Sequence, residues 1–201
     1  MRVEIPTSKS CYARIAMISA IAGIAIPYSD ENDDIIAIRT ALTVKNGRVW
    51  VGSSGTAARF AIAYYSSMDC EVVIDGSKQL QKRPMSSIID AVRRLGAEVQ
   101  GESLPLRIKG CFWTKGEVEV DASQSSQTIS ALMLAGMRSG LNIKTIGERN
   151  SWSYVELTAD VMRKFGVDVE INDGEVSVGG INNITLYNKN VYNKLMELAS
   201  D

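Results

Sequence analysis

Residues 120–136, VDASQSSQTISALMLAG, carry the pattern that organises the whole chain. A β-rich run over residues 117–120 precedes a helix pattern of alanine, isoleucine, leucine and methionine over residues 126–137. Between the two lies a hydroxyl-rich opening, residues 123–127. This order of strand, opening and helix predicts an α/β unit.

Two earlier helix patterns begin in the same way. Residues 8–10 read SKS and residues 53–56 read SSGT, and a helix pattern follows each of them. Helix patterns also come in pairs, and β-rich runs follow each pair. We therefore expect three copies of one α/β unit, related by a pseudo-threefold axis.

The rest of the chain alternates between helical and β-rich patterns. Apolar periodicity predicts six amphipathic helices and a seventh candidate, at residues 9–22, 32–42, 56–67, 84–95, 126–137, 154–165 and 190–198. Short β-rich runs predict eight strands, at residues 3–5, 44–51, 71–75, 106–108, 117–120, 142–146, 167–171 and 175–178. Asn46-Gly47 and Asp173-Gly174 are expected as hairpin turns. The predicted fold class is α/β (α+β) with mixed sheets. The sequence has no GxGxxG or P-loop motif after a predicted strand, which argues against a nucleotide-binding fold.

The composition argues against several functional classes. The 201 residues have a formal net charge of −1, so no bulk positive field favours nucleic acid or an anionic membrane. The sequence has no histidine, which removes the commonest general base and the commonest metal ligand. The cysteines form no CxxC pair, and the N-terminus has no apolar signal core. We expect a cytoplasmic protein with reduced thiols and no metal site.

Basic side chains lie close to the hydroxyl-rich openings. Lys9 is inside the first opening and Arg14 follows it by five residues. Arg59 lies three residues after Thr56, and Arg83 precedes a predicted helix. A helix start exposes backbone N–H groups and the positive end of the dipole, and arginine and lysine bind carboxylate and phosphate. Each hydroxyl could be a simple cap and each cation a solvated charge, but together they would suit a small dianion or trianion.

Five segments resemble segments of the EPSP synthase (3-phosphoshikimate 1-carboxyvinyltransferase) family, and they occur in the family's order. The five are IPTSKSCYAR (5–14), GSSGTAARF (52–60), DGSKQLQKRPMSSIIDAVRRLGAEV (75–99), VDASQSSQTISALMLAG (120–136) and SWSYVELTADVMRKFGVDVE (151–170). Each alone is a weak signal, but together they are highly specific. The resemblance implies an enolpyruvyl transferase-like α/β prism domain over residues 1–181, in which each of three units has two helices and a mixed four-stranded sheet. A tail at residues 182–201, expected to be helical, has no counterpart in it.

The family binds shikimate 3-phosphate and phosphoenolpyruvate in a cleft between two domains, and the resemblance implies roles for the matching residues. Lys9 would contact both substrates and is the implied catalytic residue. Ser10 and Arg14 would hold the shikimate ring and its carboxylate side. Tyr154 would pack against this substrate, and Gln127 would lie against its ring. The phosphate of shikimate 3-phosphate would be held by Ser125, Ser126 and Ser151.

The same resemblance implies a phosphoenolpyruvate pocket. Gly55 would line this pocket and Arg83 would clamp the substrate. Thr56 and Arg59 match the family motif and would support the loop. The family reaction implies no organic cofactor and no metal.

The chain departs from the family pattern in several respects. Ser53 stands where the family usually has asparagine, and Ser153 stands where it usually has proline. The stretch between Lys9 and Gly55 is shorter than usual, and family members are much longer overall. Their remaining part usually supplies an aspartate and a glutamate for proton transfer. We therefore expect a second domain as partner and negligible turnover by this chain alone.

Two alternatives stay open at this point. UDP-N-acetylglucosamine enolpyruvyl transferases open with a different segment, and Cys111 lacks the flanking pattern of their reactive cysteine. The second alternative is a non-catalytic ligand-binding or relic domain that kept the fold. The short chain and Ser53 favour this second alternative.

Overall fold

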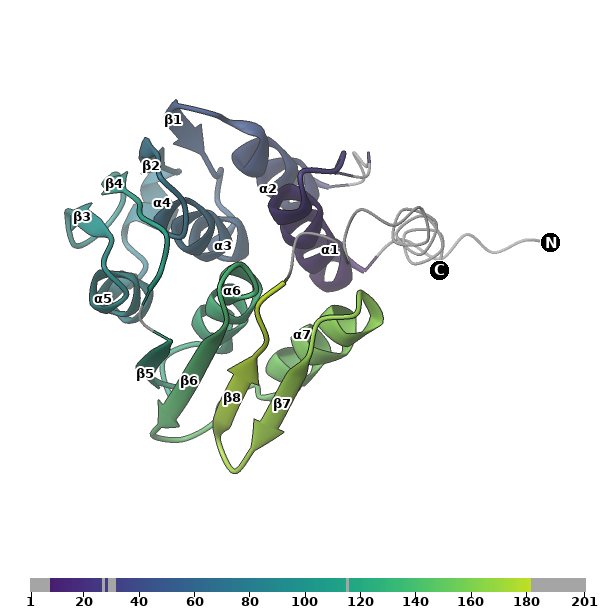
Figure 1. Ribbon diagram of the computed structural model, residues 1–201. Helices are drawn as coiled ribbons and strands as arrows, with labels where there is room; N and C mark the ends of the chain where they lie inside the picture. Colours follow the sequence, from purple (N-terminus) through teal and green to yellow (C-terminus); the bar gives the residue numbers. More distant parts are fainter. Residues whose placement is uncertain (1–7, 27, 29–31, 115, 182–201) are drawn as a thin grey trace.

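The computed structural model describes residues 8–26, 28, 32–114 and 116–181 (Figure 1). These residues contain seven helices: α1 (Lys9–Ala22), α2 (Asp33–Thr43), α3 (Gly55–Ser66), α4 (Lys78–Gln81), α5 (Ser86–Arg94), α6 (Ser126–Gly136) and α7 (Ser153–Lys164). They also contain eight strands: β1 (Gly47–Trp50), β2 (Glu71–Asp75), β3 (Glu98–Gln100), β4 (Leu106–Lys109), β5 (Glu117–Asp121), β6 (Leu141–Ile146), β7 (Val169–Asn172) and β8 (Glu175–Val178). No helix in this part of the chain is long and apolar enough to cross a membrane.

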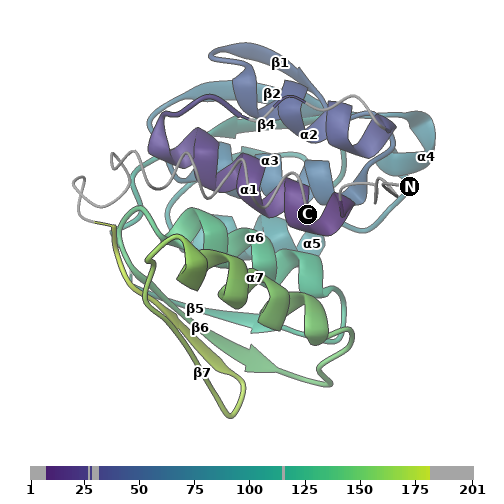
Figure 2. The same ribbon diagram turned by 90° about the vertical axis from the view of Figure 1, so that its right-hand side faces the viewer.

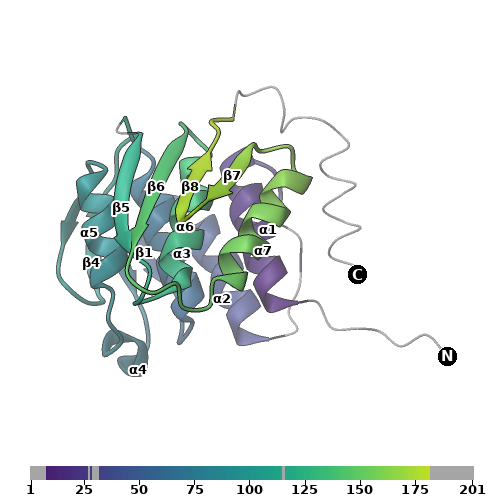
Figure 3. The ribbon, with the colours of Figure 1, turned by 90° about the horizontal axis from the view of Figure 1, so that it is seen from below.

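Two four-stranded sheets share one topology. The first has the strand order β1-β2-β4-β3, and the second has the order β5-β6-β8-β7, which can be followed in Figure 3. In each sheet the first two strands are parallel and the remaining pairs are antiparallel. A helix connects each parallel pair, α3 in the first sheet and α6 in the second, because a parallel pair needs a long crossover.

These two repeats confirm the predicted α/β class and its two-helix, four-stranded unit. The first repeat contains α3 and α5, and the second contains α6 and α7. The third predicted unit is represented among the described residues by α1 and α2, which pack against each other. The strand predicted at residues 3–5, the helix at 190–198 and the tail at 182–201 fall outside the described residues.

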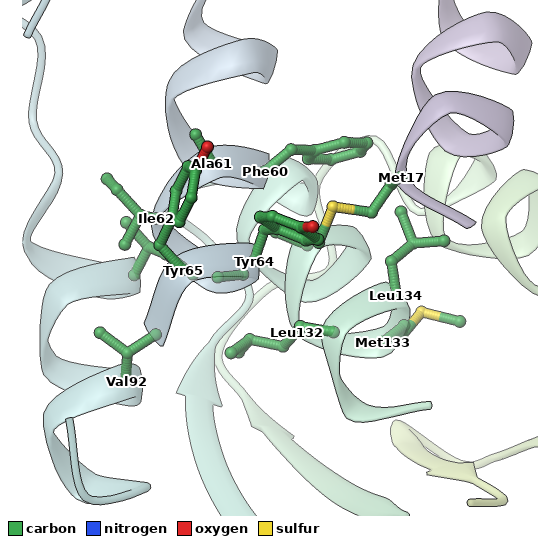
Figure 4. Close-up of a cluster of buried hydrophobic side chains, with 14 of the residues drawn as sticks. Met17, Phe60, Ala61, Ile62, Tyr64, Tyr65, Val92, Leu132, Met133 and Leu134 are labelled. Carbon is green, nitrogen blue, oxygen red and sulfur yellow. The ribbon is translucent and has the colours of Figure 1, made fainter. Parts of the chain in front are cut away.

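The helices form a layer between the two sheets (Figure 2). Within this layer α6 packs against α3 and α7, and every residue of α6 except Gln127 is buried. After its first turn α6 is almost wholly apolar. A helix with apolar side chains on every face is buried on every face, which explains its position. Met17 of α1, Phe60 and Tyr64 of α3, and Leu132 of α6 belong to one core (Figure 4). This core fixes the helix starts relative to one another.

The six predicted helices with described residues are confirmed to within two residues at each end. Their boundaries follow local signals. Ser8 caps α1 at its start, and Gly23 ends it with φ 68°. Two elements were missed, α4 with four residues and β3 with three, because neither is long enough to show a period.

Only one of the two predicted hairpin turns is a hairpin. Asp173 and Gly174, with φ 43° and 89°, join β7 to the antiparallel β8. The prediction for Asn46-Gly47 is wrong, because Asn46 precedes β1 and Gly47 is its first residue, the element before this pair is the helix α2, and β1 pairs in parallel with β2. Gly47 does turn the chain, with φ 96°. A turn dipeptide redirects the backbone but does not specify which element precedes it.

Candidate functional site

The starts of α1, α3 and α6 meet at one cleft of about 430 Å³. Ten of the twelve predicted site residues line it: Lys9, Ser10, Arg14, Thr56, Arg83, Ser125, Ser126, Gln127, Ser151 and Tyr154. The other two, Gly55 and Arg59, lie against lining residues. Residues from five separate sequence segments are therefore brought to one place.

The repeated topology explains why these helix starts converge. α3 follows β1 and α6 follows β5, and these are the equivalent strands of the two sheets. The two openings therefore occupy equivalent positions in the two repeats. α1 packs against both α3 and α6, and so adds the third opening.

The serines of the openings cap their helices. Ser8 Oγ accepts from the Cys11 N–H at 3.5 Å, and Ser54 Oγ accepts from the Ala57 N–H at 3.3 Å. Ser125 Oγ accepts from the Gln127 N–H at 3.2 Å while it lines the cleft. Three positive helix ends consequently face one cleft, which is an arrangement suited to an anion.

An ion pair joins two lining residues from different helices. Lys9 Nζ lies 3.2 Å from Asp34 Oδ2, and the two side chains are 58% and 49% exposed. Solvent screens such a pair, so Lys9 can exchange Asp34 for an anionic ligand at little cost. Asp34 is the only acidic lining residue in the part of the chain that the structure describes. Sequence reasoning missed Asp34, because a carboxylate in the first turn of a helix is ordinary.

Gly55 lets two guanidinium groups approach the start of α3. A Cβ built on Gly55 would lie 2.6 Å from Arg83 Nη1 and 3.2 Å from Arg59 Nη1. Any side chain at this position would displace Arg83. Burial, with a smaller contribution from the Arg83 charge, lowers the pKa of Arg59 to about 10. Arg59 is still a cation at neutral pH.

Arg59 ties together three segments of the site. It is 6% exposed, and its guanidinium donates to Gly55 O at 3.2 Å, to Pro84 O at 2.9 Å and to Gln127 Oε1 at 3.0 Å. Gln127 in turn donates from Nε2 to Thr56 Oγ1 at 3.0 Å. The two helix openings and the segment that carries Arg83 are thus held in register.

Arg14 lies in the cleft wall, but its guanidinium is bonded to the protein. The residue is 3% exposed, and it donates to Ser10 O at 2.7 Å and to Thr158 Oγ1 at 2.8 Å. It also donates to Tyr154 O at 2.8 Å and Ser130 Oγ at 3.3 Å. Burial lowers the pKa of Arg14 to about 10. Arg14 therefore positions Ser10 and Tyr154 relative to each other.

The loop before α7 closes another side of the cleft. It contributes Asn150 and Ser151, and α7 contributes Tyr154, which is 47% exposed. Ser151 has φ 56°, which is unusual for a residue with a Cβ. Sequence reasoning found Ser151 and Tyr154 but not Asn150.

Apolar lining was also missed. Ile38 of α2 and Phe60 of α3 line the cleft, yet in the sequence both are ordinary periodic core positions. Among the described residues, no group of three or more acidic, cysteine or histidine side chains could hold a metal ion.

Comparison with known proteins identifies the family of this chain. The family described as EPSP synthase (3-phosphoshikimate 1-carboxyvinyltransferase) matches residues 4–192. The 3-phosphoshikimate 1-carboxyvinyltransferase of Caldivirga maquilingensis is 33% identical over 199 residues, which cover 88% of this chain and 48% of that protein. The protein of the same name from Thermococcus kodakarensis is 44% identical over 126 residues, which cover 62% of this chain and 31% of that protein.

A solved structure shares the fold. EPSP synthase from Acinetobacter baumannii superposes with a TM-score of 0.72 and 22% sequence identity, covering 90% of this chain and 47% of that chain. The chain thus spans less than half the length of these curated relatives and of this solved structure.

Proposed function

This chain belongs to the EPSP synthase family, and we propose that its cleft binds shikimate 3-phosphate as part of an enolpyruvyl transferase. One observation carries the proposal: three helix starts and the cations Lys9, Arg14 and Arg83 surround a single cleft of about 430 Å³. Sites for small ligands usually have volumes of a few hundred cubic ångströms. Backbone N–H groups and cations together suit a phosphorylated carboxylic acid.

In this proposal the phosphate of shikimate 3-phosphate lies at the start of α6. Ser125 and Ser126 offer hydroxyl groups there, and the positive end of the helix favours a dianion. Ser151 approaches from the loop before α7. Hydrogen bonds to an ionised phosphate are stronger than those between neutral groups, so a few hydroxyls suffice.

The ring and carboxylate are assigned to the wall formed by α1 and α7. Four hydrogen bonds to the protein engage four of the five N–H groups of Arg14, which leaves one for a carboxylate. Ser10 and Tyr154, which Arg14 holds, flank that position. Gln127 supplies a polar contact to the ring from α6.

Phosphoenolpyruvate is assigned to the region around Gly55, Arg83 and Lys9. The proposed reaction moves its enolpyruvyl group to the 5-hydroxyl of shikimate 3-phosphate. The methylene carbon is protonated, the hydroxyl oxygen attacks the adjacent carbon with loss of its proton, and loss of phosphate and one methyl proton restores the double bond. Lys9 and Arg83 offset the negative charge of the reacting group. The proton donor and acceptor are assigned to a second domain, so this chain alone gives no turnover.

Titration calorimetry with shikimate 3-phosphate tests the binding role. We expect binding by the wild type and affinity about tenfold weaker for Lys9→Ala, which removes one charged contact. Lys109→Ala is the matched control, because Lys109 also forms an exposed ion pair, with Glu98, but lies outside the cleft. Absence of binding at millimolar ligand contradicts the proposal and supports a relic domain. Steady turnover by the purified chain contradicts the assignment of proton transfer to a second domain.

A further inference from the structure

The loop between β6 and α7 has a strained residue at the cleft. Ser151, which lines the cleft, has φ 56°, in the left-handed region that residues with a Cβ rarely adopt. A conformation of this kind persists only where the surrounding structure holds it. The contacts that hold this loop therefore determine where Ser151 lies.

Hydrogen bonds made by residues of this loop and by Tyr154 supply part of this restraint. The Asn150 N–H donates to Glu148 O at 3.0 Å, and Asn150 Nδ2 donates to Ser123 O at 3.2 Å. The Tyr154 N–H donates to Ser151 O at 3.1 Å. All five residues are exposed, so water competes for each of these bonds. These bonds alone are a weak restraint.

Arg149 adds contacts to a different part of the fold. Its guanidinium carbon lies 5.4 Å from the centre of the Trp152 ring, so the guanidinium packs on that ring. Nη2 lies 3.6 Å from Asp173 Oδ1 in the β7–β8 turn, but solvent screens this ion pair because the two side chains are 41% and 104% exposed. The guanidinium also covers Gly174. A Cβ built on Gly174 would lie 2.1 Å from Arg149 Nη2 and 2.7 Å from Cζ. Glycine at this position leaves the space that the guanidinium fills.

The β7–β8 turn is itself anchored. Gly174 O accepts from the Thr145 N–H at 3.1 Å, which ties the turn to β6. Arg149 therefore connects the loop to a turn that is hydrogen-bonded to the second sheet. Arg149 is not among the residues that line the cleft.

We propose that Arg149, held between Trp152 and the β7–β8 turn, is a positioning residue that fixes Ser151 at the cleft and thereby sets the affinity of the site for a phosphate group. The inference rests on the proposed function, because phosphate is the ligand group assigned to Ser151. Arg149 acts through the loop and not by contact with the ligand.

Two variants break this contact from opposite sides. Arg149→Ala removes the guanidinium, and Gly174→Ala fills its place with a methyl group. Arg107→Ala is the control for charge, since Arg107 is an exposed arginine paired with Glu71 outside the cleft. Gly140→Ala is the control for backbone strain. Gly140 has φ 86° against 89° for Gly174, but the nearest atom to its built Cβ is 3.5 Å away.

Two measurements separate the local effect from binding. NMR without ligand measures how fast the backbone amide hydrogens of Asn150 and Tyr154 exchange with water. We expect this exchange to be faster in Arg149→Ala and Gly174→Ala than in the wild type, and exchange in the second sheet to be unchanged. Calorimetry with shikimate 3-phosphate should show an affinity about three- to tenfold weaker in Arg149→Ala and Gly174→Ala than in the wild type. This loss corresponds to the free energy of ordering one or two side chains on binding. Both controls should stay within about twofold of the wild type.

The outcomes are distinct. Wild-type affinity in Arg149→Ala overturns the inference, whatever the exchange rates are. If the wild type binds no shikimate 3-phosphate, the proposed function fails, and the exchange rates then decide whether Arg149 fixes the loop. Unchanged exchange in Arg149→Ala overturns the inference in that case too, and faster exchange confined to the loop supports it.

Discussion

The guanidinium of Arg59 donates a hydrogen bond of 3.0 Å to the side-chain oxygen of Gln127, which is 68 residues away in the sequence. The amide nitrogen of Gln127 donates to Thr56 Oγ1 at 3.0 Å. These two bonds fix the orientation of the amide. Gln127 can therefore offer a ligand its second N–H as a donor, while Arg59 occupies one of the two lone pairs of its oxygen.

Removal of the Arg59 guanidinium should destabilise the fold as well as the site. Arg59→Met keeps the apolar stem but leaves the acceptors at Gly55, Pro84 and Gln127 without this donor. We expect the free energy of unfolding to fall by about 3 kcal/mol. Urea unfolding followed by circular dichroism measures this. Arg107→Met changes an exposed side chain of β4 and should change the free energy of unfolding by less than about 0.5 kcal/mol. Equal losses in the two variants would contradict this explanation.

A methyl group at Gly55 should affect ligand binding more than stability. In Gly55→Ala the Cβ would lie 2.6 Å from Arg83 Nη1, so Arg83 must move. Because Gly55 begins α3 and alanine favours a helix, stability should not fall. We expect weaker binding of phosphoenolpyruvate and near-normal binding of shikimate 3-phosphate. Calorimetry with each ligand checks this, and equal losses for both would show that Arg83 does not discriminate between them.

Two buried threonines should respond oppositely to replacement by valine. Thr158 Oγ1 accepts from Arg14 at 2.8 Å and donates to Tyr154 O at 2.7 Å, whereas Thr128 Oγ1 is buried without a partner among the described residues. Thr158→Val should lower the free energy of unfolding by about 1–2 kcal/mol. Thr128→Val should leave it unchanged or raise it by up to about 1 kcal/mol. Thermal unfolding of the two variants is the measurement, and a larger loss in Thr128→Val would contradict the hydrogen-bonding scheme.

Asp75 should contribute to the acid sensitivity of the fold. Burial alone raises the pKa of Asp75, but hydrogen bonds from Arg48, Gln81 and the Gly76 N–H outweigh burial and hold the pKa below 3.8. As the pH falls, the Asp75 carboxylate is therefore protonated at a higher pH in the unfolded chain than in the folded protein. The contribution to stability is complete above about pH 4 and is lost as the pH falls through the lower folded-state pKa.

Asp75→Asn should accordingly flatten the dependence of the unfolding free energy on pH below about pH 4. Urea midpoints measured from about pH 2.5 to pH 6 give this slope. Asp160→Asn removes an exposed carboxylate that pairs with Arg163 and serves as the control. A wild-type slope in Asp75→Asn would show that this carboxylate is not linked to folding.

Helix starts could be predicted from the sequence because their signals are local. Ser8, Ser54 and Ser125 each cap a helix through an N–H two or three residues further on. The same locality explains the error at Asn46-Gly47. The dipeptide predicts a turn, but only long-range pairing makes β1 a parallel partner of β2.

The amino-acid order alone was enough to indicate the α/β class, the helix bounds and most of the polar residues that line the cleft. It was not enough to assign partners. The sequence indicated Arg14 as a site residue but not its hydrogen-bond partners Thr158 and Tyr154, which are 144 and 140 residues away. Asp34 was not predicted as a cleft residue, because its contact with Lys9 also joins two separate helices. A local pattern reports on neighbours within a turn or two of helix, whereas these contacts exist because α1 packs against α7 and α2.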